Sequence, residues 1–99
     1  MGLYIALQKE SGELVEGVAD DKNLLHSLLP RDDGSLLSFI DLYGDTTFNG
    51  LQTKPFLIEW QELQKAARSE EEVTLLNDIQ TLAARCRDGI HLYLKFVGD

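Results

Sequence analysis

The chain has 99 residues, of which 43% are hydrophobic and 26% are charged, and these are ordinary values for one globular domain. Its formal net charge is −8, which argues against nucleic-acid binding, because that binding depends on neutralising phosphates with Lys and Arg. No apolar run approaches the roughly 20 residues that a membrane-spanning helix needs. We therefore expect a single domain over residues 1–99 that binds neither nucleic acid nor membrane.

The N-terminus and the cysteine content bear on the location of the protein. Residues 1–6 lack the basic stretch that begins a secretory signal peptide. The single cysteine, Cys86, excludes an internal disulfide bond and a multi-thiolate zinc site. Together these features favour a cytoplasmic protein.

A strand and a possible hairpin open the chain. Apolar side chains alternate over residues 3–8, as in a strand with one buried face. A turn-like Glu-Ser-Gly-Glu cluster follows and leads into residues 13–18, which are a possible second strand. Gly17 would weaken that strand, so its existence stays open.

A short helix is predicted next, over residues 21–29. Asp20 and Asp21 are candidate caps for its N-terminus, and leucines form one stripe along it. Pro30 ends it, because the residue before a proline avoids helical backbone angles.

The middle of the chain contains one predicted strand and one undecided segment. Residues 36–42 form an apolar run of a length that suits a largely buried strand. Residues 46–50 are either a returning strand with an Asn-Gly turn or a helical turn capped by Asp45. We expect the capped turn.

Two longer helices are predicted from their start signals. Pro55 suits the first turn of a helix over 55–68. Ser69 begins an S-x-x-E capping pattern at the start of a helix over 70–87, and Gly89 supplies a left-handed stop. The predicted inward face of this second helix consists of Val73, Leu76, Ile79, Leu82, Ala83 and Cys86.

The chain ends in an alternating pattern that predicts a strand over 90–97. The predicted buried face of that strand consists of Ile90, Leu92, Leu94 and Phe96. These elements indicate an α+β fold, with two or three helices packed on a small, mostly antiparallel sheet. The strands of that sheet lie near 3–8, 36–42 and 90–97, with 13–18 as a possible fourth.

The acidic charge gives the first functional hypothesis. Residues 1–53 carry a net charge of −6, and an acidic field attracts basic partners. We predict a non-enzymatic protein-binding domain, and small acidic inhibitors of the immunity-protein kind share its size and charge. The candidate partner-binding residues are Asp20, Asp21, Asp32, Asp33 and Tyr43.

Two alternatives stay open. Asp41 and Asp45 flank a glycine turn and could form an acid/base pair or hold a divalent cation, with His26 or His91 nearby. However, the sequence contains no catalytic or cofactor-binding motif, so a small enzyme is the alternative and no cofactor is expected. The other alternative is a homodimer formed through an exposed edge strand such as 90–97.

Overall fold

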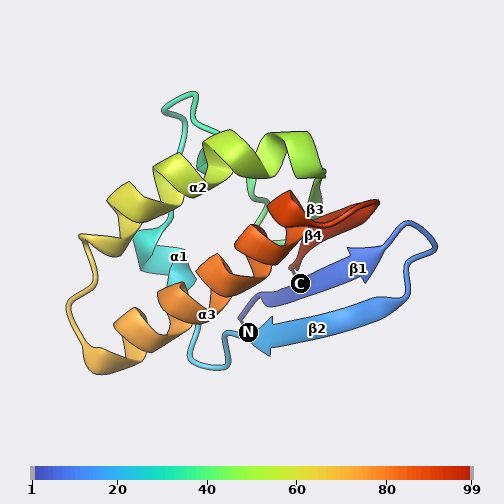
Figure 1. The fold of residues 1–99 in the computed structure, drawn as a ribbon. Helices are drawn as coiled ribbons and strands as arrows, with labels where there is room; N and C mark the ends of the chain where they lie inside the picture. The colour runs from blue at the N-terminus through green and yellow to red at the C-terminus, as the bar shows by residue number, and fades with distance from the viewer. Residues whose placement is uncertain (1, 99) are drawn as a thin grey trace.

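The protein is an α+β domain in a computed structural model that describes residues 2–98. Four antiparallel strands form one sheet in the order β2-β1-β4-β3, and the helices pack beside it (Figure 1). The elements, in chain order, are β1 (Tyr4–Lys9), β2 (Leu14–Ala19), α1 (Leu25–Leu28), the 3₁₀ turn η1 (Leu37–Phe39), β3 (Asp45–Phe48), α2 (Gly50–Gln64), α3 (Glu70–Asp88) and β4 (Leu92–Val97). The predicted fold class is confirmed.

The centre of the sheet supplies one wall of the core. Ile5 pairs with Phe96 and Leu7 pairs with Leu94 across β1 and β4, and all four side chains are fully buried. Ile90 is different, since it is 81% exposed and precedes the strand. The backbone of His91 has a positive φ of 56°, so the alternating geometry begins only after it.

β4 is an internal strand, which overturns the edge-strand prediction for residues 90–97. It pairs with β1 on one side and with β3 on the other. The edges of the sheet are instead β2 and β3. The edge position cannot be read from alternation, because alternation reports the buried face and not the strand's neighbours.

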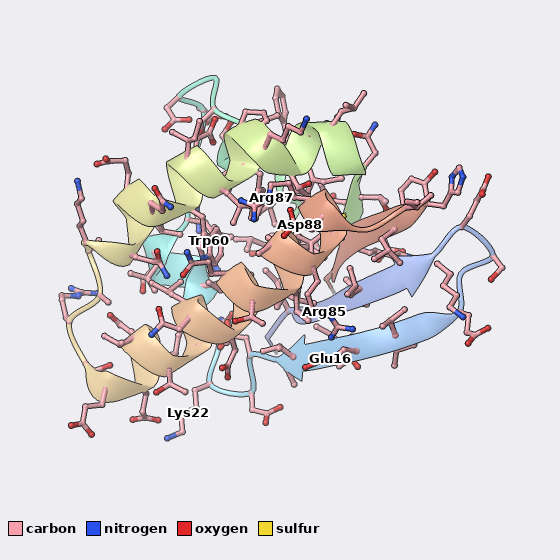
Figure 2. All side chains as sticks on the ribbon, viewed as in Figure 1. Glu16, Lys22, Trp60, Arg85, Arg87 and Asp88 are labelled. Carbon is pink, nitrogen blue, oxygen red and sulfur yellow. The ribbon has the colours of Figure 1, made fainter. Side chains whose placement is uncertain are left out.

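The possible hairpin strand is present as β2, which pairs with β1. The side chain of Tyr4 compensates for the missing side chain of Gly17 in this strand. A Cβ atom at Gly17 would lie 1.8 Å from the hydroxyl oxygen of Tyr4, so the tyrosine occupies the space that the missing side chain leaves. Glu16 of the same strand pairs with Arg85 of α3 and joins the edge of the sheet to that helix (Figure 2).

The predicted strand over 36–42 is wrong. The run instead contains η1, and the nearby strand is β3, which begins at Asp45. Leu37 and Ile40 are buried while Phe39 is exposed, and this spacing of three residues is that of a helical turn. The expected helical turn capped by Asp45 is therefore also wrong.

α2 begins five residues before its predicted start at Pro55. Its N-cap is Asn49, whose side chain accepts from the backbone N–H of Gln52, while the Gln52 side chain accepts from the Asn49 N–H, each at 2.9 Å. Two reciprocal hydrogen bonds fix this start, and Pro55 lies inside the helix. The Asn-Gly pair is thus a cap and not a hairpin turn. The helix ends at Gln64, before the predicted end at residue 68.

α3 matches its prediction most closely. The Ser69 hydroxyl accepts from the Glu72 N–H at 3.1 Å. The inward residues confirmed as buried are Leu76, Ile79, Leu82, Ala83 and Cys86. The prediction that Val73 faces inward is wrong, because Val73 is 45% exposed and Leu75 is buried instead. Gly89 ends the helix without a left-handed conformation, at a φ of −91°.

Trp60 joins the two long helices. Its indole Nε1–H donates to the backbone carbonyl of Leu76 at 2.9 Å, and its ring stacks on Phe56 with centroids 5.2 Å apart. Figure 2 shows Trp60 between α2 and α3. Because α2 is fixed by this contact, it can serve as a support for the loop that packs against it.

Candidate protein-binding surface

The chain between α1 and β3, residues 29–44, is the longest stretch without a strand or an α-helix. We call it the 29–44 segment. Its first turn reaches beyond α2 (Figure 1). Loops longer than about 12–15 residues are uncommon inside compact domains and are usually functional or disordered. A disordered segment would make few contacts with the core, so the contacts of this segment decide whether it is ordered.

The first half of the segment is held by the core and by α2. Leu29, Leu37 and Ile40 are buried. The Glu59 carboxylate on α2 accepts hydrogen bonds from the backbone N–H groups of Leu36 at 3.2 Å and of Leu37 at 3.1 Å. These bonds satisfy the free N–H groups at the start of η1, which would otherwise have no partner.

The second half is held by the end of the sheet. The Asp41 N–H donates to the Thr46 hydroxyl and the Tyr43 N–H donates to the Asp41 carboxylate, each at 2.9 Å. The Gly98 N–H donates to the Gly44 carbonyl at 2.7 Å. A Cβ atom at Gly98 would lie 2.5 Å from the Leu42 carbonyl oxygen, so glycine permits this close approach. The segment is therefore an ordered loop.

The outer side of this ordered loop presents aromatic and acidic side chains together. Phe39 is 65% exposed and Tyr43 is 73% exposed. Asp32 and Asp41 are also exposed, and with Tyr43 they line a depression of about 240 Å³. One exposed aromatic side chain, Tyr43, thus lies beside two carboxylates at one concave place, whereas Phe39 is not part of its lining.

A second depression lies on the other side of the segment, against α2. Its volume is about 350 Å³, and Leu28, Leu37 and Leu63 contribute to its walls. Asp33 and Glu62 also line it. Hydrogen bonds from the side chain and backbone of Ser35 lower the pKa of Asp33.

The carboxylates of the segment outnumber its single cation, Arg31, which lines the same depression as Asp32 and Asp41. Over residues 2–98, Asp32, Asp33 and Asp41 form no ion pair, whereas most lysines and arginines pair with carboxylates elsewhere. Arg31 is directed to His26, where its Nη2 donates to the backbone carbonyl at 3.3 Å. The surface therefore presents a net negative charge to a partner.

The five predicted partner-binding residues fall in three different surroundings. Asp32, Asp33 and Tyr43 belong to the 29–44 segment. Asp20 is buried, and its carboxylate accepts from the N–H groups of Leu24 and Leu25, each at 2.9 Å. Its role is to cap α1, which is shorter than the predicted 21–29 helix.

Asp21 lies apart from the 29–44 segment. It lines a groove of about 450 Å³ beside the N-terminal half of α3, with Glu70, Glu71 and Asp78. Lys22 also lines this groove and pairs with Glu71. Acidic residues in the first turn of a helix are favoured by the helix dipole, so Glu70 and Glu71 have a structural explanation.

The alternative residues Asp41 and Asp45 have protein partners. Asp41 accepts from the Tyr43 N–H, and Asp45 on β3 pairs with Lys95 at 3.4 Å. His91 Nδ1 lies 3.6 Å from a Glu10 carboxylate oxygen. Across residues 2–98, no group of three or more His, Cys, Asp or Glu side chains is placed to hold a metal ion.

Cys86 lies in the core, as its position on the inward face of α3 predicts. Its Sγ is 3.3 Å from the Leu92 carbonyl oxygen, and burial raises the pKa of the thiol. A protonated, buried thiol is a poor nucleophile.

Two residues of the candidate surface and its support were not predicted from the sequence. Phe39 was assigned to a buried strand, although its neighbours Leu37 and Ile40 have the spacing of a helical turn. Glu59 lies within the predicted helix over 55–68, and nothing in its local sequence indicates the backbone N–H groups from which its carboxylate accepts hydrogen bonds. Contacts between residues more than twenty positions apart in the sequence leave no local sequence pattern.

Comparison of the chain with protein-family models, with curated proteins and with solved structures finds no match. In the described part of the chain, no helix combines the length and the apolar character needed to cross a bilayer. The description of the candidate surface therefore rests on the residues of this chain and not on a relative.

Proposed function

We propose that this domain is a non-enzymatic protein-binding module, and that its 29–44 segment engages a basic segment of a partner protein. The observation that carries the proposal is the exposure of Phe39 and Tyr43 on an ordered loop, with carboxylates that form no ion pair among residues 2–98. Tyrosine and other aromatic side chains are enriched among the residues that anchor protein–protein contacts.

The order of the loop favours binding. A loop that already has its bound conformation loses little conformational entropy when a partner arrives. Glu59 and Thr46 supply that order through hydrogen bonds to the loop backbone. The aromatic side chains then act as anchors, while the carboxylates speed the approach of a cationic partner.

The chemistry of the surface describes the partner. The depression beside Tyr43 suits an apolar side chain, and Asp32 and Asp41 at its rim suit lysine or arginine. A basic groove on another protein would offer both an apolar side chain and a lysine or arginine. A small acidic inhibitor of the immunity type would act by covering such a groove. We place this interaction in the cytoplasm, where the single thiol of Cys86 would stay reduced.

A displayed random-peptide library, selected on the immobilised domain, tests the proposal with defined probes. We expect selected peptides to combine Lys or Arg with an apolar residue. Tyr43→Ala and Phe39→Ala should each weaken a selected peptide on the order of tenfold, since they remove anchors. Asp32→Asn should mainly slow association and reduce its salt dependence.

The controls are exposed residues outside the surface. Asp78→Asn makes the same charge change on α3, and Val73→Ala removes an exposed apolar side chain there. Both should bind like the native domain. Selected peptides without basic residues, or equal losses in the controls, would contradict the proposal.

A further inference from the structure

The outer edge of β3 begins where the 29–44 segment ends. β3 is an outer strand of the sheet and pairs with β4. The Thr46 hydroxyl on this strand donates to the Phe39 carbonyl at 3.4 Å and accepts from the Asp41 N–H at 2.9 Å. Tyr43 lies two residues before the strand. Both exposed aromatic residues of the segment are therefore neighbours of this edge.

The pairing of β3 with β4 decides which backbone groups of β3 point outward. The Gly98 N–H donates to the Gly44 carbonyl, so these two residues form a hydrogen-bonded pair at the start of the ladder. Hydrogen-bonded and non-hydrogen-bonded pairs alternate along an antiparallel ladder, which directs the backbone groups of Thr46 toward β4. The N–H and C=O groups of Asp45 and Thr47 therefore point away from the sheet. Both residues are exposed, and in the described part of the chain these groups have no backbone partner.

We propose that the partner segment binds as an extended chain and adds one strand to the sheet at the outer edge of β3. This inference rests on the proposed function and specifies the conformation in which the same basic segment is recognised. Unpaired N–H and C=O groups at a sheet edge are a template for such strand addition. β3 has only four residues, so its backbone offers few hydrogen bonds. Phe39 and Tyr43 beside it supply the apolar contacts that so short an edge lacks.

Charge favours a basic segment over a second copy of this chain at the β3 edge. Asp41 forms no ion pair among residues 2–98, and Asp45 pairs with a single cation, Lys95. A second copy would bring a further net charge of −8 to this edge, and like charges oppose association. The other edge strand, β2, lies at the opposite side of the sheet from the aromatic residues. A register shift also interrupts its pairing with β1, and bulges protect an edge from strand addition.

Backbone N-methylation of a basic peptide selected on the domain tests strand addition and leaves the protein unchanged. Alternate N–H groups of a strand point to the same neighbour. Methylation should therefore weaken binding on the order of tenfold at every second residue of the contacting stretch, and little at the residues between. Fluorescence anisotropy measures the Kd of each peptide. Losses without a period of two, in a peptide whose binding still depends on Tyr43, would overturn strand addition and leave the proposed function standing. A library that yields no basic peptide dependent on Tyr43 would refute both.

Proline substitutions test which edge of the sheet is used. Thr47→Pro removes an N–H that points away from β4, and proline is tolerated at such edge positions. Its circular dichroism should match that of the native domain, while the selected peptide should bind on the order of tenfold more weakly. Thr47→Ala keeps the N–H and should bind like the native domain.

The control at the other edge is Ala19→Pro. Because the Asp20 N–H donates to the Leu3 carbonyl of the neighbouring chain segment, the Ala19 N–H points outward from β2. This variant makes the same change on β2 and should bind like the native domain. Equal binding by Thr47→Pro and Thr47→Ala, or a loss in Ala19→Pro alone, would refute the assignment of the β3 edge.

Discussion

The carboxylate of Asp20 fixes the start of α1 by accepting from two backbone N–H groups, those of Leu24 and Leu25. The Asp20 N–H in turn donates to the Leu3 carbonyl at 2.9 Å. This residue therefore joins the end of the β1–β2 hairpin to the first helix. Its acidity serves the fold, whereas that of Asp21 is exposed to solvent.

Asp20→Ala and Asp21→Ala should accordingly differ in stability. Loss of the Asp20 cap should lower the free energy of unfolding by about 1–2 kcal/mol, the usual cost of removing a capping side chain. Asp21→Ala should change it by no more than about 0.5 kcal/mol, as exposed substitutions do. Urea unfolding followed by circular dichroism measures both. Equal effects would remove the structural role that we assign to Asp20.

Glu59 has a comparable role toward the candidate surface. Its carboxylate is the contact through which α2 holds the N–H groups of Leu36 and Leu37. Glu59→Gln should cost about 1.5–3 kcal/mol, because the amide has a single acceptor oxygen, so that one of the two charged hydrogen bonds is lost and the other is weakened. Amide exchange at Leu36 and Leu37 should accelerate.

The control for Glu59 is Glu62 on the same helix, which forms an exposed pair with Lys65. Exposed pairs of this kind contribute little to stability. Glu62→Gln should leave both the unfolding midpoint and amide exchange in the loop unchanged. If both variants behave alike, the loop is not held by Glu59.

At the scale of elements, the orientation of α3 decides how the helices cover the sheet. Ile79 is fully buried on its inner face, while Val73 is partly exposed. Ile79→Ala should lower the free energy of unfolding by about 2–5 kcal/mol, as truncation in a packed core does. Val73→Ala should have a much smaller effect. A larger loss from Val73→Ala would mean that the helix is rotated from the orientation described.

The elements also show which sequence patterns can be read without a structure. α3 was predictable because its cap, its charged ends and its apolar period agree with one another. The run 36–42 was not, because an apolar segment of that length is compatible with a strand or a helical turn. The predicted start of α2 at Pro55 was wrong for a related reason. Proline is favoured at a helix start, but the reciprocal Asn49–Gln52 cap lies earlier and decides where α2 begins.

At the scale of the whole molecule, topology separates two acidic surfaces. The 29–44 segment also exposes aromatic side chains, whereas the groove beside α3 is lined by Asp21, Glu70 and Glu71. Asp32, Asp33 and Tyr43, which were selected from charge and residue type, lie together in the 29–44 segment. The sequence could not place Asp20 in the interior or β4 between two strands, because both depend on which strand ends meet in space.

The most direct test of the account is a map of where a selected basic peptide binds. Backbone amide chemical shifts of the ¹⁵N-labelled native domain would be followed during titration with that peptide. We predict the largest changes in residues 32–43, and their loss in Tyr43→Ala. Changes centred on the groove lined by Asp21 and Asp78, or on the exposed Leu51 and Ile58 of α2, would contradict the assignment of the 29–44 segment as the partner-binding surface.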